Sequence, residues 1–400
     1  MIPLLIFAGT YFVLAFGSIP RFRIDRTGAA IIGAALMLAS GILSFDEAMH
    51  AVDHGTLVLL FGMMIVVANL RLAGFFRWVA AWVVRHAHRP LTLLAGIVVV
   101  AGVFSAVFVN DTMCLVLTPL VLEVMQALRR NPVPYLLAVA MASNAGSVAT
   151  ITGNPQNMMI GSLSRLPYGK FAAELTPIAL ISLAVVFAVI ALLYRREFFH
   201  APTVDVPTMR VHVNRLLLIK SLVVSVCMMI GFFAGQPVSA VALIGGALLL
   251  ITRRVKPEKV YHEIDFSLLV LFAGLFIVVA GMEKTGLPQT FFDQARHFGL
   301  SRTPVLAGAA ALLSNLVSNV PAVLVFRPLV TQLPDPAHGW LTLAMASTLA
   351  GNLTVLGSVA NLIVIQRARH EVPISFLEYA RAGIPVTLLT LAAGTAWLAW

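Results

Sequence analysis

The stretch AMASNAGSVATITGNPQN, from Ala140 to Asn157, returns later in the chain as AMASTLAGNLTVLGSVAN, from Ala344 to Asn361. The two 18-residue copies align without a gap and are identical at seven positions. Each interrupts a long apolar run with Gly, Asn, Ser and Thr. Duplicated helices that are broken in this way are the sequence feature that best indicates the binding site of a secondary transporter.

The composition excludes an ordinary soluble protein. Hydrophobic residues make up 60% of the chain and charged residues 11%, and the mean hydropathy is +0.94. Apolar runs of about 20 residues recur, which is typical of a polytopic α-helical membrane protein. The net charge of +10 does not indicate a nucleic-acid partner, because the basic residues lie in short loops between apolar runs and form no nucleic-acid motif. The two cysteines both lie in apolar runs and predict no disulfide framework.

Ten apolar segments are expected to cross the bilayer, five in each half of the chain, and the first is interpreted as a membrane span and not as a signal peptide. These segments are Pro3–Gly17, Thr27–Leu43, Gly55–Ala73, Pro134–Leu163, Pro177–Tyr194, Leu216–Phe233, Val238–Ile251, Phe266–Met282, Gly339–Gln366 and Ala382–Leu398.

Two further apolar segments, Leu91–Leu128 and Pro304–Leu333, are long enough to enter the membrane and return. Each contains a polar cluster: VNDT around Asn110 in the first, and SNLVSN ending at Asn319 in the second. We interpret both as re-entrant hairpins with a polar tip. Irregular backbone at that depth is tolerated only where protein buries it or where it lines a cavity.

The repeat extends over both halves of the chain. Asp53–Gly74 aligns with Asp265–Gly286 without gaps and matches at ten of 22 positions. We therefore divide the chain into a first repeat (1–194, with hairpin 91–128 and broken helix 134–163), a cytoplasmic linker (195–215) and a second repeat (216–400, with hairpin 304–333 and broken helix 339–366).

Charge predicts the topology. If both hairpins return to their starting side, 21 of the 27 Lys and Arg residues fall on one face and five on the other, with Arg327 inside the second hairpin. The basic face is expected to be cytoplasmic, in a bacterial-type inner membrane. Both termini then lie outside, and the two repeats are inverted. The first hairpin enters from the cytoplasm and the second from outside.

The helix breaks and hairpin tips are the parts of the chain expected to bind ions. A broken helix exposes N–H groups that favour anions at one half-helix end and C=O groups that favour cations at the other. Gly153 and Gly357 let the backbone approach a ligand, and Pro155 keeps the first break open. A single Asn in a membrane helix usually forms a structural hydrogen bond to a neighbouring helix. Recurrence at equivalent positions favours ligand binding by the pairs Asn110/Asn319 and Asn157/Asn361.

Asp111 is the acidic residue of the first tip, and its counterpart in the second tip is Val320. A carboxylate within the membrane is costly, so it is expected to bind a cation or carry a proton; the alternative is a structural acceptor within the hairpin. Arg327 lies about 12 Å beyond Asn319 along a helical limb and is expected to reach the outer interface.

Three further residues have structural interpretations. Cys114 could bind arsenic(III) but is expected to be a small buried residue. Asp53 and Asp265 stand at equivalent span starts and are expected to cap helices.

At these residues the chain resembles the ion transporter superfamily, which includes the divalent anion:sodium symporters, the arsenite permeases and the NhaD-type sodium/proton antiporters. The symporters carry Ser-Asn-Thr at each hairpin tip, with a proline nine residues after the Asn. Here the tips read Val109-Asn110-Asp111 and Ser318-Asn319-Val320, and the proline spacing is kept. The stretch FVNDTMCLVLTPLV is closer to the arsenite-permease pattern, with Asn-Asp at the first tip, and favours proton coupling through Asp111.

The resemblance implies roles for individual residues. It implies sodium binding at Asn110/Gly153 and at Asn319/Gly357, no other cofactor, an elevator motion and a homodimer. The residues then expected to bind a small anionic substrate are Asn110, Thr112, Asn157, Ser318, Asn319 and Asn361. The residues then expected to couple a cation or proton are Asn110, Asp111, Gly153, Asn154, Asn319 and Gly357.

The sequence therefore predicts an all-α transporter of small anions or oxyanions (dicarboxylate, citrate, sulfate or arsenite), driven by a sodium or proton gradient. A sodium/proton antiporter is the alternative within transporters. An ion channel fits the paired hairpins poorly. An intramembrane metalloprotease would need a His-Glu-x-x-His motif, which the sequence lacks, so no enzymatic activity is expected.

Overall fold

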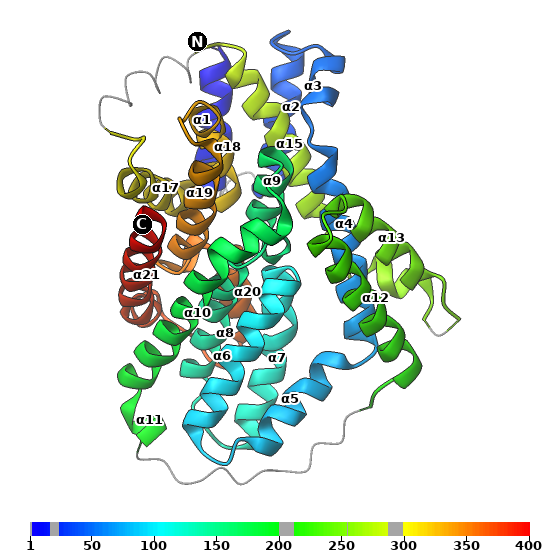
Figure 1. The fold of residues 1–400 in the computed structure, drawn as a ribbon, viewed down its shortest axis with the longest axis vertical. Coiled ribbons are helices and arrows are strands. Elements are labelled where there is room, and N and C mark those ends of the chain that lie inside the picture. The colour runs from blue at the N-terminus through cyan, green and yellow to red at the C-terminus, as the bar shows by residue number, and fades with distance from the viewer. Residues whose placement is uncertain (1, 17–23, 200–211, 254, 287–298) are drawn as a thin grey trace.

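A computed structural model describes residues 2–16, 24–199, 212–253, 255–286 and 299–400 (Figure 1). The regular structure of these residues is helical, which confirms the predicted all-α fold class. The first half contains α1 (Ile2–Phe16), α2 (Arg26–Ala39), α3 (Phe45–Ala51), α4 (His54–Leu72), α5 (Phe75–His86), α6 (Pro90–Val107), α7 (Asn110–Ala127), α8 (Val133–Ser147), α9 (Pro155–Ser164), α10 (Tyr168–Leu193) and α11 (Arg195–Phe199).

The second half repeats this order. It contains α12 (Arg215–Phe233), α13 (Val238–Leu250), α14 (Pro257–Tyr261), α15 (Phe266–Glu283), α17 (Thr303–Val317), α18 (Asn319–Val330), α19 (Pro336–Ala350), α20 (Val359–Ala368) and α21 (Phe376–Ala399).

Within the described residues, six helices are long and apolar enough to cross a membrane by themselves: α4, α6, α10, α12, α15 and α21. This finding agrees with a multi-pass membrane protein. Length alone does not separate crossings from hairpin limbs, because α6 is one limb of a hairpin. The number of ten crossings therefore stays a prediction.

Both segments expected to form hairpins fold as two packed helices. The first bends at Phe108 and Val109, between α6 and α7, and the second bends at Ser318, between α17 and α18. The two duplicated stretches are broken helices. A 3-10 turn at Ile151–Gly153 separates α8 from α9, and a 3-10 turn at Val355–Gly357 separates α19 from α20. The polar residues therefore lie at the bends and breaks, where the sequence places them.

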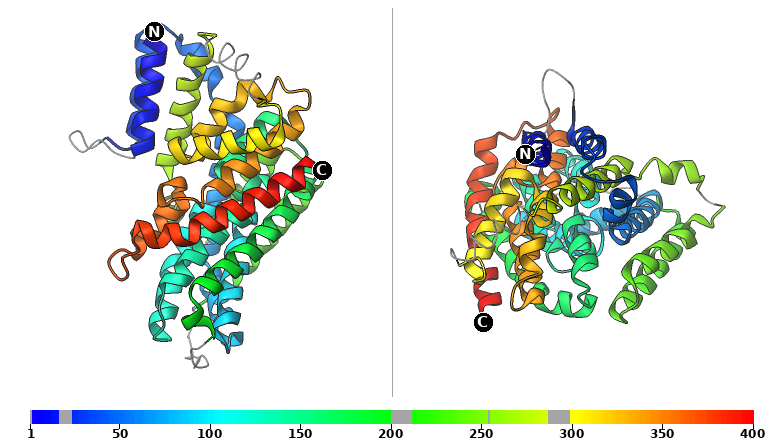
Figure 2. Two further views of the ribbon diagram at one scale, coloured as in Figure 1. Left: turned by 90° about the vertical axis from the view of Figure 1, so that its left-hand side faces the viewer. Right: turned by 90° about the horizontal axis from the view of Figure 1, so that it is seen from above.

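Helices from the two halves pack on each other. Helix α4 of the first half packs on α12 and α13 of the second, on the right of Figure 1. Conversely, α15 of the second half packs on α1 and α2 of the first, at the top of the same view. The long helices α10 and α21 run diagonally side by side along another face (Figure 2). Each half therefore supplies part of the packing surface that the other needs.

Aspartate residues cap the N-termini of α4 and α15, the two helices that pack on the opposite half of the chain. The Asp53 carboxylate accepts a hydrogen bond from Gly55 N at 3.2 Å, and the Asp265 carboxylate accepts one from Leu268 N at 3.0 Å. These bonds satisfy backbone N–H groups that have no partner within the helix. The predicted capping roles are confirmed.

Two expectations about the elements are wrong. Helix α10 begins at Tyr168 and not at Pro177, which lies inside the helix. Helix α5 was not expected: it buries Phe75, Phe76 and Val83 on one face and leaves tryptophans exposed on the other, so it is too short and too amphipathic to be recognised as a span. The short helices α3, α11 and α14 were also missed.

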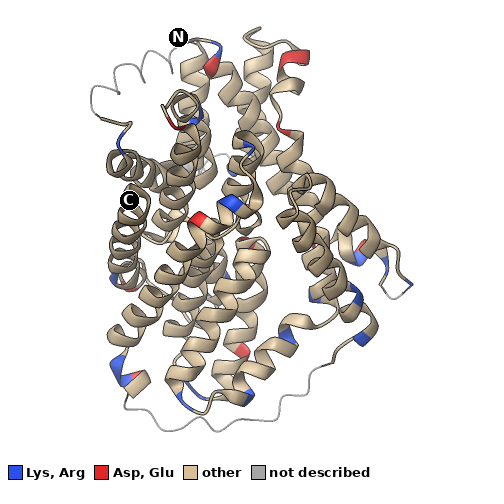
Figure 3. Ribbon diagram, viewed as in Figure 1, with Lys and Arg blue, Asp and Glu red and all other residues tan. Residues whose placement is uncertain are grey.

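The linker and the charge distribution bear on topology. The expected linker 195–215 starts with the short helix α11, and its residues 200–211 lie outside the described part. Figure 3 shows Lys and Arg at the lower end of the molecule, where α5, α11 and the start of α12 lie, and also near the top and on the right of the view. The side on which each terminus lies stays a prediction.

Candidate functional site

The two hairpin tips and the two helix breaks meet at one pocket. Its polar lining consists of Arg26, Asn110, Asp111, Gln156, Ser318, Asn319 and Ser358. Its apolar lining consists of Leu14, Pro155, Leu268, Leu271, Phe272, Leu275, Val320, Pro321 and Val359. Tips and breaks therefore supply most of the polar groups, while α1 and α15 supply most of the apolar wall.

Four helices begin at this pocket: α7, α9, α18 and α20. A helix N-terminus carries about half a positive charge and has N–H groups without a partner inside the helix. At α7 and α18 no side chain caps the first turn. At α9 and α20 a side chain caps part of it: Asn154 accepts from Asn157 N at 2.8 Å, and Ser358 accepts from Ala360 N at 3.2 Å. Four such ends around one cavity favour a negative charge inside it.

The first break depends on a close backbone approach. A Cβ added to Gly153 would lie 2.1 Å from Ser147 O, so only glycine fits this position without a backbone shift. The amide of Asn157 donates to Ser147 O at 3.1 Å and to Thr150 O at 3.0 Å. These bonds satisfy carbonyls that the helix end leaves unpaired.

The second break has the same construction. A Cβ on Gly357 would lie 2.9 Å from Gly351 O, and the Asn361 amide donates to Gly351 O at 2.7 Å and to Thr354 O at 3.0 Å. Asn361 and Asn157 are both fully buried and lie outside the pocket lining. The structure therefore uses these amides to hold the breaks, and a substrate role for them stays a prediction.

An amide network joins the first tip to both breaks. Asn144 in α8 donates to Asn352 Oδ1 at 2.9 Å and to Asn361 Oδ1 at 3.1 Å. Its own oxygen accepts from Asn110 Nδ2 at 3.2 Å and from Ser358 Oγ at 3.0 Å. Because all these groups are buried, a missing partner would cost the desolvation of the group left behind. The network therefore fixes the first tip and the two broken helices relative to one another.

The second tip is held by carbonyl groups of the second broken helix. In the amide orientation that satisfies both its oxygen and its nitrogen, Asn319 has its nitrogen 3.0 Å from Gly357 O and 3.1 Å from Ser347 O. Its oxygen accepts from Gln156 Nε2 at 3.1 Å. Gln156 follows the first break, so this contact links the two halves across the pocket.

Ser318, at the second tip, has φ +79° and ψ +160°. This region of backbone space is nearly exclusive to glycine, and a residue with a side chain there carries about 1–3 kcal/mol of strain. Such strain is concentrated at ligand sites. Ser318 lines the pocket as predicted for a tip residue, whereas Thr112 of the first tip lies outside the lining.

Asp111 lies in the first turn of α7, is partly exposed and lines the pocket. Within the described part of the chain its carboxylate has no ion-pair or hydrogen-bond partner, so the alternative of a structural acceptor finds no support there. An acidic group in the first turn of a helix is favourable. A role for this carboxylate in taking up a proton or a cation stays a prediction.

The donor set fits a sodium ion better at the first tip than at the second. Asn110 Oδ1 is buried and has no hydrogen-bond partner among the described residues, and it lines the same pocket as Asp111. An unpaired amide oxygen beside a carboxylate is a donor set that a hard cation prefers. At the second tip, Gly357 O already accepts the Asn319 amide. Clusters of three or more His, Cys, Asp or Glu are absent from the described part.

Three pocket residues were not predicted as ligands: Arg26, Gln156 and Ser358. Gln156 and Ser358 lie directly beside the predicted break residues, so the break motif could have identified both. Arg26 is one of the 21 basic residues that the charge count places on the cytoplasmic face. No local motif distinguishes it, because the packing of α2 beside the tips is what brings it to the pocket.

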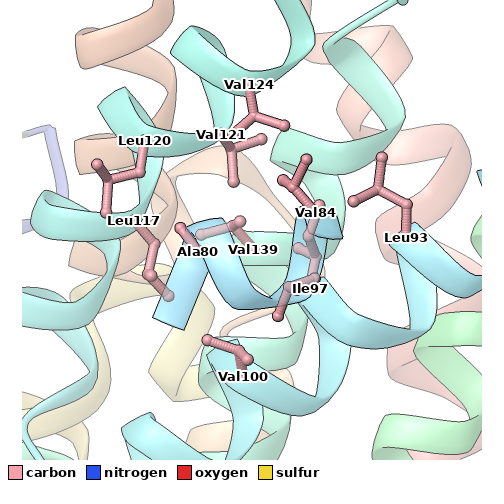
Figure 4. A pocket seen from close by; sticks show the side chains of 11 residues that line it. Ala80, Val84, Leu93, Ile97, Val100, Leu117, Leu120, Val121, Val124 and Val139 are labelled. Atoms are coloured by element: carbon pink, nitrogen blue, oxygen red, sulfur yellow. The ribbon is translucent and has the colours of Figure 1, made fainter. Parts of the chain in front are cut away.

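Two other expected residues lie away from the pocket. Arg327 is paired with Glu283 at 3.9 Å and is partly exposed. Cys114 is fully buried, as expected of a small core residue. A second, smaller cavity lies between α5, α6, α7 and α8, and Figure 4 shows the aliphatic side chains around it. That lining offers no partner to a charged solute.

Comparisons with known proteins agree on a transport family. Residues 11–350 match the family model described as citrate transporter. A 46 kDa membrane protein of Mycobacterium leprae is 31% identical over 97% of this chain and 96% of its own length. The silicon efflux transporter LSI3 of Oryza sativa subsp. japonica is 31% identical over 96% and 95% of the two chains. A putative transporter, arsB, of Dictyostelium discoideum is 22% identical over 93% and 86%.

One solved structure shares the fold. The chain is similar to the crystal structure of the YdaH transporter of Alcanivorax borkumensis, with a TM-score of 0.63 over all of this chain and 98% of the other. The sequence identity is 15%, so this likeness concerns the fold alone.

Proposed function

The chain belongs to the citrate transporter family, and from this premise we propose that it carries a small anion or oxyanion across the inner membrane, coupled to a sodium or proton gradient. Its relatives are transporters and not enzymes. The observation that carries the anionic substrate is the meeting of four helix N-termini at one pocket. These ends favour a negative charge without requiring a particular anion. Citrate, dicarboxylates, sulfate and arsenite are the classes to test.

The proposed coupling site is the first tip. Asp111 carries a charge into the pocket without a partner in the described residues, and Asn110 offers an unpaired oxygen beside it. A proton or a sodium ion bound there would cancel the carboxylate charge before the anion arrives. The same pair of groups favours sodium/proton antiport as the second candidate function.

The proposed transport cycle is an elevator motion within a homodimer. The hairpins and broken helices form one hydrogen-bonded unit, while α1, α2 and α15 present a mainly apolar wall to it. An apolar wall lets such a unit slide with few polar bonds to break. Sodium at Asn110/Gly153 and at Asn319/Gly357 is proposed as the alternative to a proton.

The test is uptake by the purified full-length protein in liposomes. Labelled citrate, succinate, sulfate and arsenite are each offered under an imposed sodium gradient, an imposed pH gradient, or neither. We expect one class of anion to accumulate only with a gradient. Uptake that ignores both gradients contradicts secondary transport. Sodium/proton exchange without uptake of any of these anions favours the second candidate function.

A further inference from the structure

We propose that Arg26 binds the substrate's oxyanion group directly and selects charged oxyanions over uncharged hydroxides such as silicic acid. This inference rests on the proposed function and refines its substrate class. Arg26 is the first residue of α2, is partly buried, and lines the pocket together with both hairpin tips. In the described part of the chain it is the cationic side chain of that lining.

The guanidinium of Arg26 has no protein partner in the described residues. The five described ion pairs involve other side chains. The neighbouring carboxylate, Asp25, is engaged as the helix cap and accepts from Gly28 N at 2.8 Å. Asp111 lines the same pocket but forms no ion pair with Arg26. A partly buried charge without a paired partner is costly, so an anionic ligand that binds the guanidinium explains a cation at this position.

The position of Arg26 also opposes the stability of its own helix. A cation in the first turn faces the positive end of the helix dipole, where acidic residues are favoured. Arg26 therefore adds its charge to the partial charges of four other helix ends around the same cavity. The resulting positive potential stabilises a bound anion and not the helix.

The other polar groups of the pocket divide the site into two parts. Asp111 and the buried, unpaired Asn110 Oδ1 suit a cation or proton. Arg26 lies on a helix outside the hydrogen-bonded unit of tips and breaks, and suits the anion. Its planar guanidinium matches two oxygens of a carboxylate or sulfate, and lysine offers the charge without this fork. An uncharged hydroxide would gain little binding energy from the charge or from the planar geometry of the guanidinium.

The experiment compares four forms of the full-length protein in liposomes: wild type, R26Q, R26K and R215Q. Arg215 is a matched control, because it is also the first residue of a helix, α12, but it is exposed and lies outside the pocket. Uptake of labelled citrate, succinate and sulfate gives KM and the maximal rate. Thermal stabilisation by citrate in detergent gives binding without transport, and unlabelled silicic acid is tested as a competitor.

We expect R26Q to raise KM for the transported anion about tenfold or more, since a hydrogen bond to a charged group contributes about 1.5–3 kcal/mol. R26K should lie between R26Q and wild type, R215Q should match wild type, and silicic acid should not compete. The stabilisation by citrate should weaken in the same order. If R26Q does not fold, R26K alone decides: an unchanged KM overturns the assignment, and a raised KM supports it.

The outcomes separate this inference from the proposed function. Anion uptake by R26Q with the KM of wild type overturns the role of Arg26 and leaves anion transport standing. Uptake of silicic acid by wild type, competition by silicic acid, or uptake of arsenite at neutral pH, where it is the uncharged hydroxide As(OH)3, overturns the selectivity for charged substrates. Wild-type liposomes that take up none of the anions overturn the proposed function, and the Arg26 assignment with it.

Discussion

Asp111 and Val320 occupy equivalent positions of the two hairpin tips, and both line the pocket. Only Asp111 can carry a charge. The surrounding amides, by contrast, recur in both halves: Asn157 and Asn361 clamp the carbonyls of their breaks in the same way. At the scale of residues, the duplication therefore accounts for the amides that hold both helix breaks. The difference between the two copies places a titratable carboxyl group at the first hairpin tip only.

Removing the charge at Asp111 tests its role in coupling. We expect D111N to abolish the dependence of anion uptake on the driving gradient, because an amide can neither release a proton nor attract a cation strongly. The measurement is uptake with and without a pH or sodium gradient. The control is E123Q on the same helix, where Glu123 lies in an exposed pair with Arg77. Wild-type gradient dependence in D111N would contradict the coupling role.

Ser318 allows a test of strain at the second tip. The positive φ of Ser318 favours glycine. We expect the relief of backbone strain in S318G to outweigh the greater conformational freedom of its unfolded chain. The variant should then unfold at a higher temperature, with an unfolding free energy about 1 kcal/mol larger. S318A keeps a Cβ and should give no such gain. Unfolding in detergent, followed by tryptophan fluorescence, measures both variants. A lower midpoint for S318G than for S318A would exclude strain at this residue.

At the scale of elements, the breaks and tips are where local sequence is most informative. Gly, Asn and Ser interrupt otherwise apolar runs, and helix starts and ends fall at those residues. Helix α5 shows the limit of this information. Its apolar residues cover one face only, so its place depends on what packs against that face. Helix α10 shows a second limit, since Pro177, the predicted start of a span, lies inside the helix.

The close approach at the first break leads to a prediction about Gly153. We expect G153A to destabilise the protein by about 1–3 kcal/mol and to lose most transport, because the added methyl would overlap Ser147 O. The matched control is G308A in α17, where an added Cβ meets nothing within 4 Å and should be tolerated. Thermal midpoints and initial uptake rates are compared. Equal midpoints for the two variants would contradict the tight break.

At the scale of the whole molecule, the two halves are held together because α4 packs on helices of the second half and α15 packs on helices of the first half. Arg71 of α4 also forms an ion pair with Glu263, which precedes α15, and this pair adds a contact between the two halves. With this packing, the pocket receives its apolar wall from α1 and α15 and its polar groups from both halves. A half taken alone would expose these surfaces.

The predicted topology can be tested by labelling. In a variant with both native cysteines replaced by alanine, R196C is expected to react with a membrane-impermeant maleimide from the cytoplasmic side only. R302C is expected to react from the outer side only. Both positions are exposed in the structure. Labelling of both from the same side would contradict the inverted arrangement, and exchanged sides would reverse the orientation of the protein.

The sequence by itself determined the fold class, the positions of the tips and breaks, and most of the polar residues that line the pocket. It could do so because the apolar length of a span and the interruption of a helix are local properties of the chain. Only the tertiary structure decided that Asn157 and Asn361 hold the breaks from outside the pocket lining, and that Arg26 lies within it. These placements depend on packing between segments far apart in the chain, such as α2 beside the tips, and no local pattern records which distant surface a side chain will face.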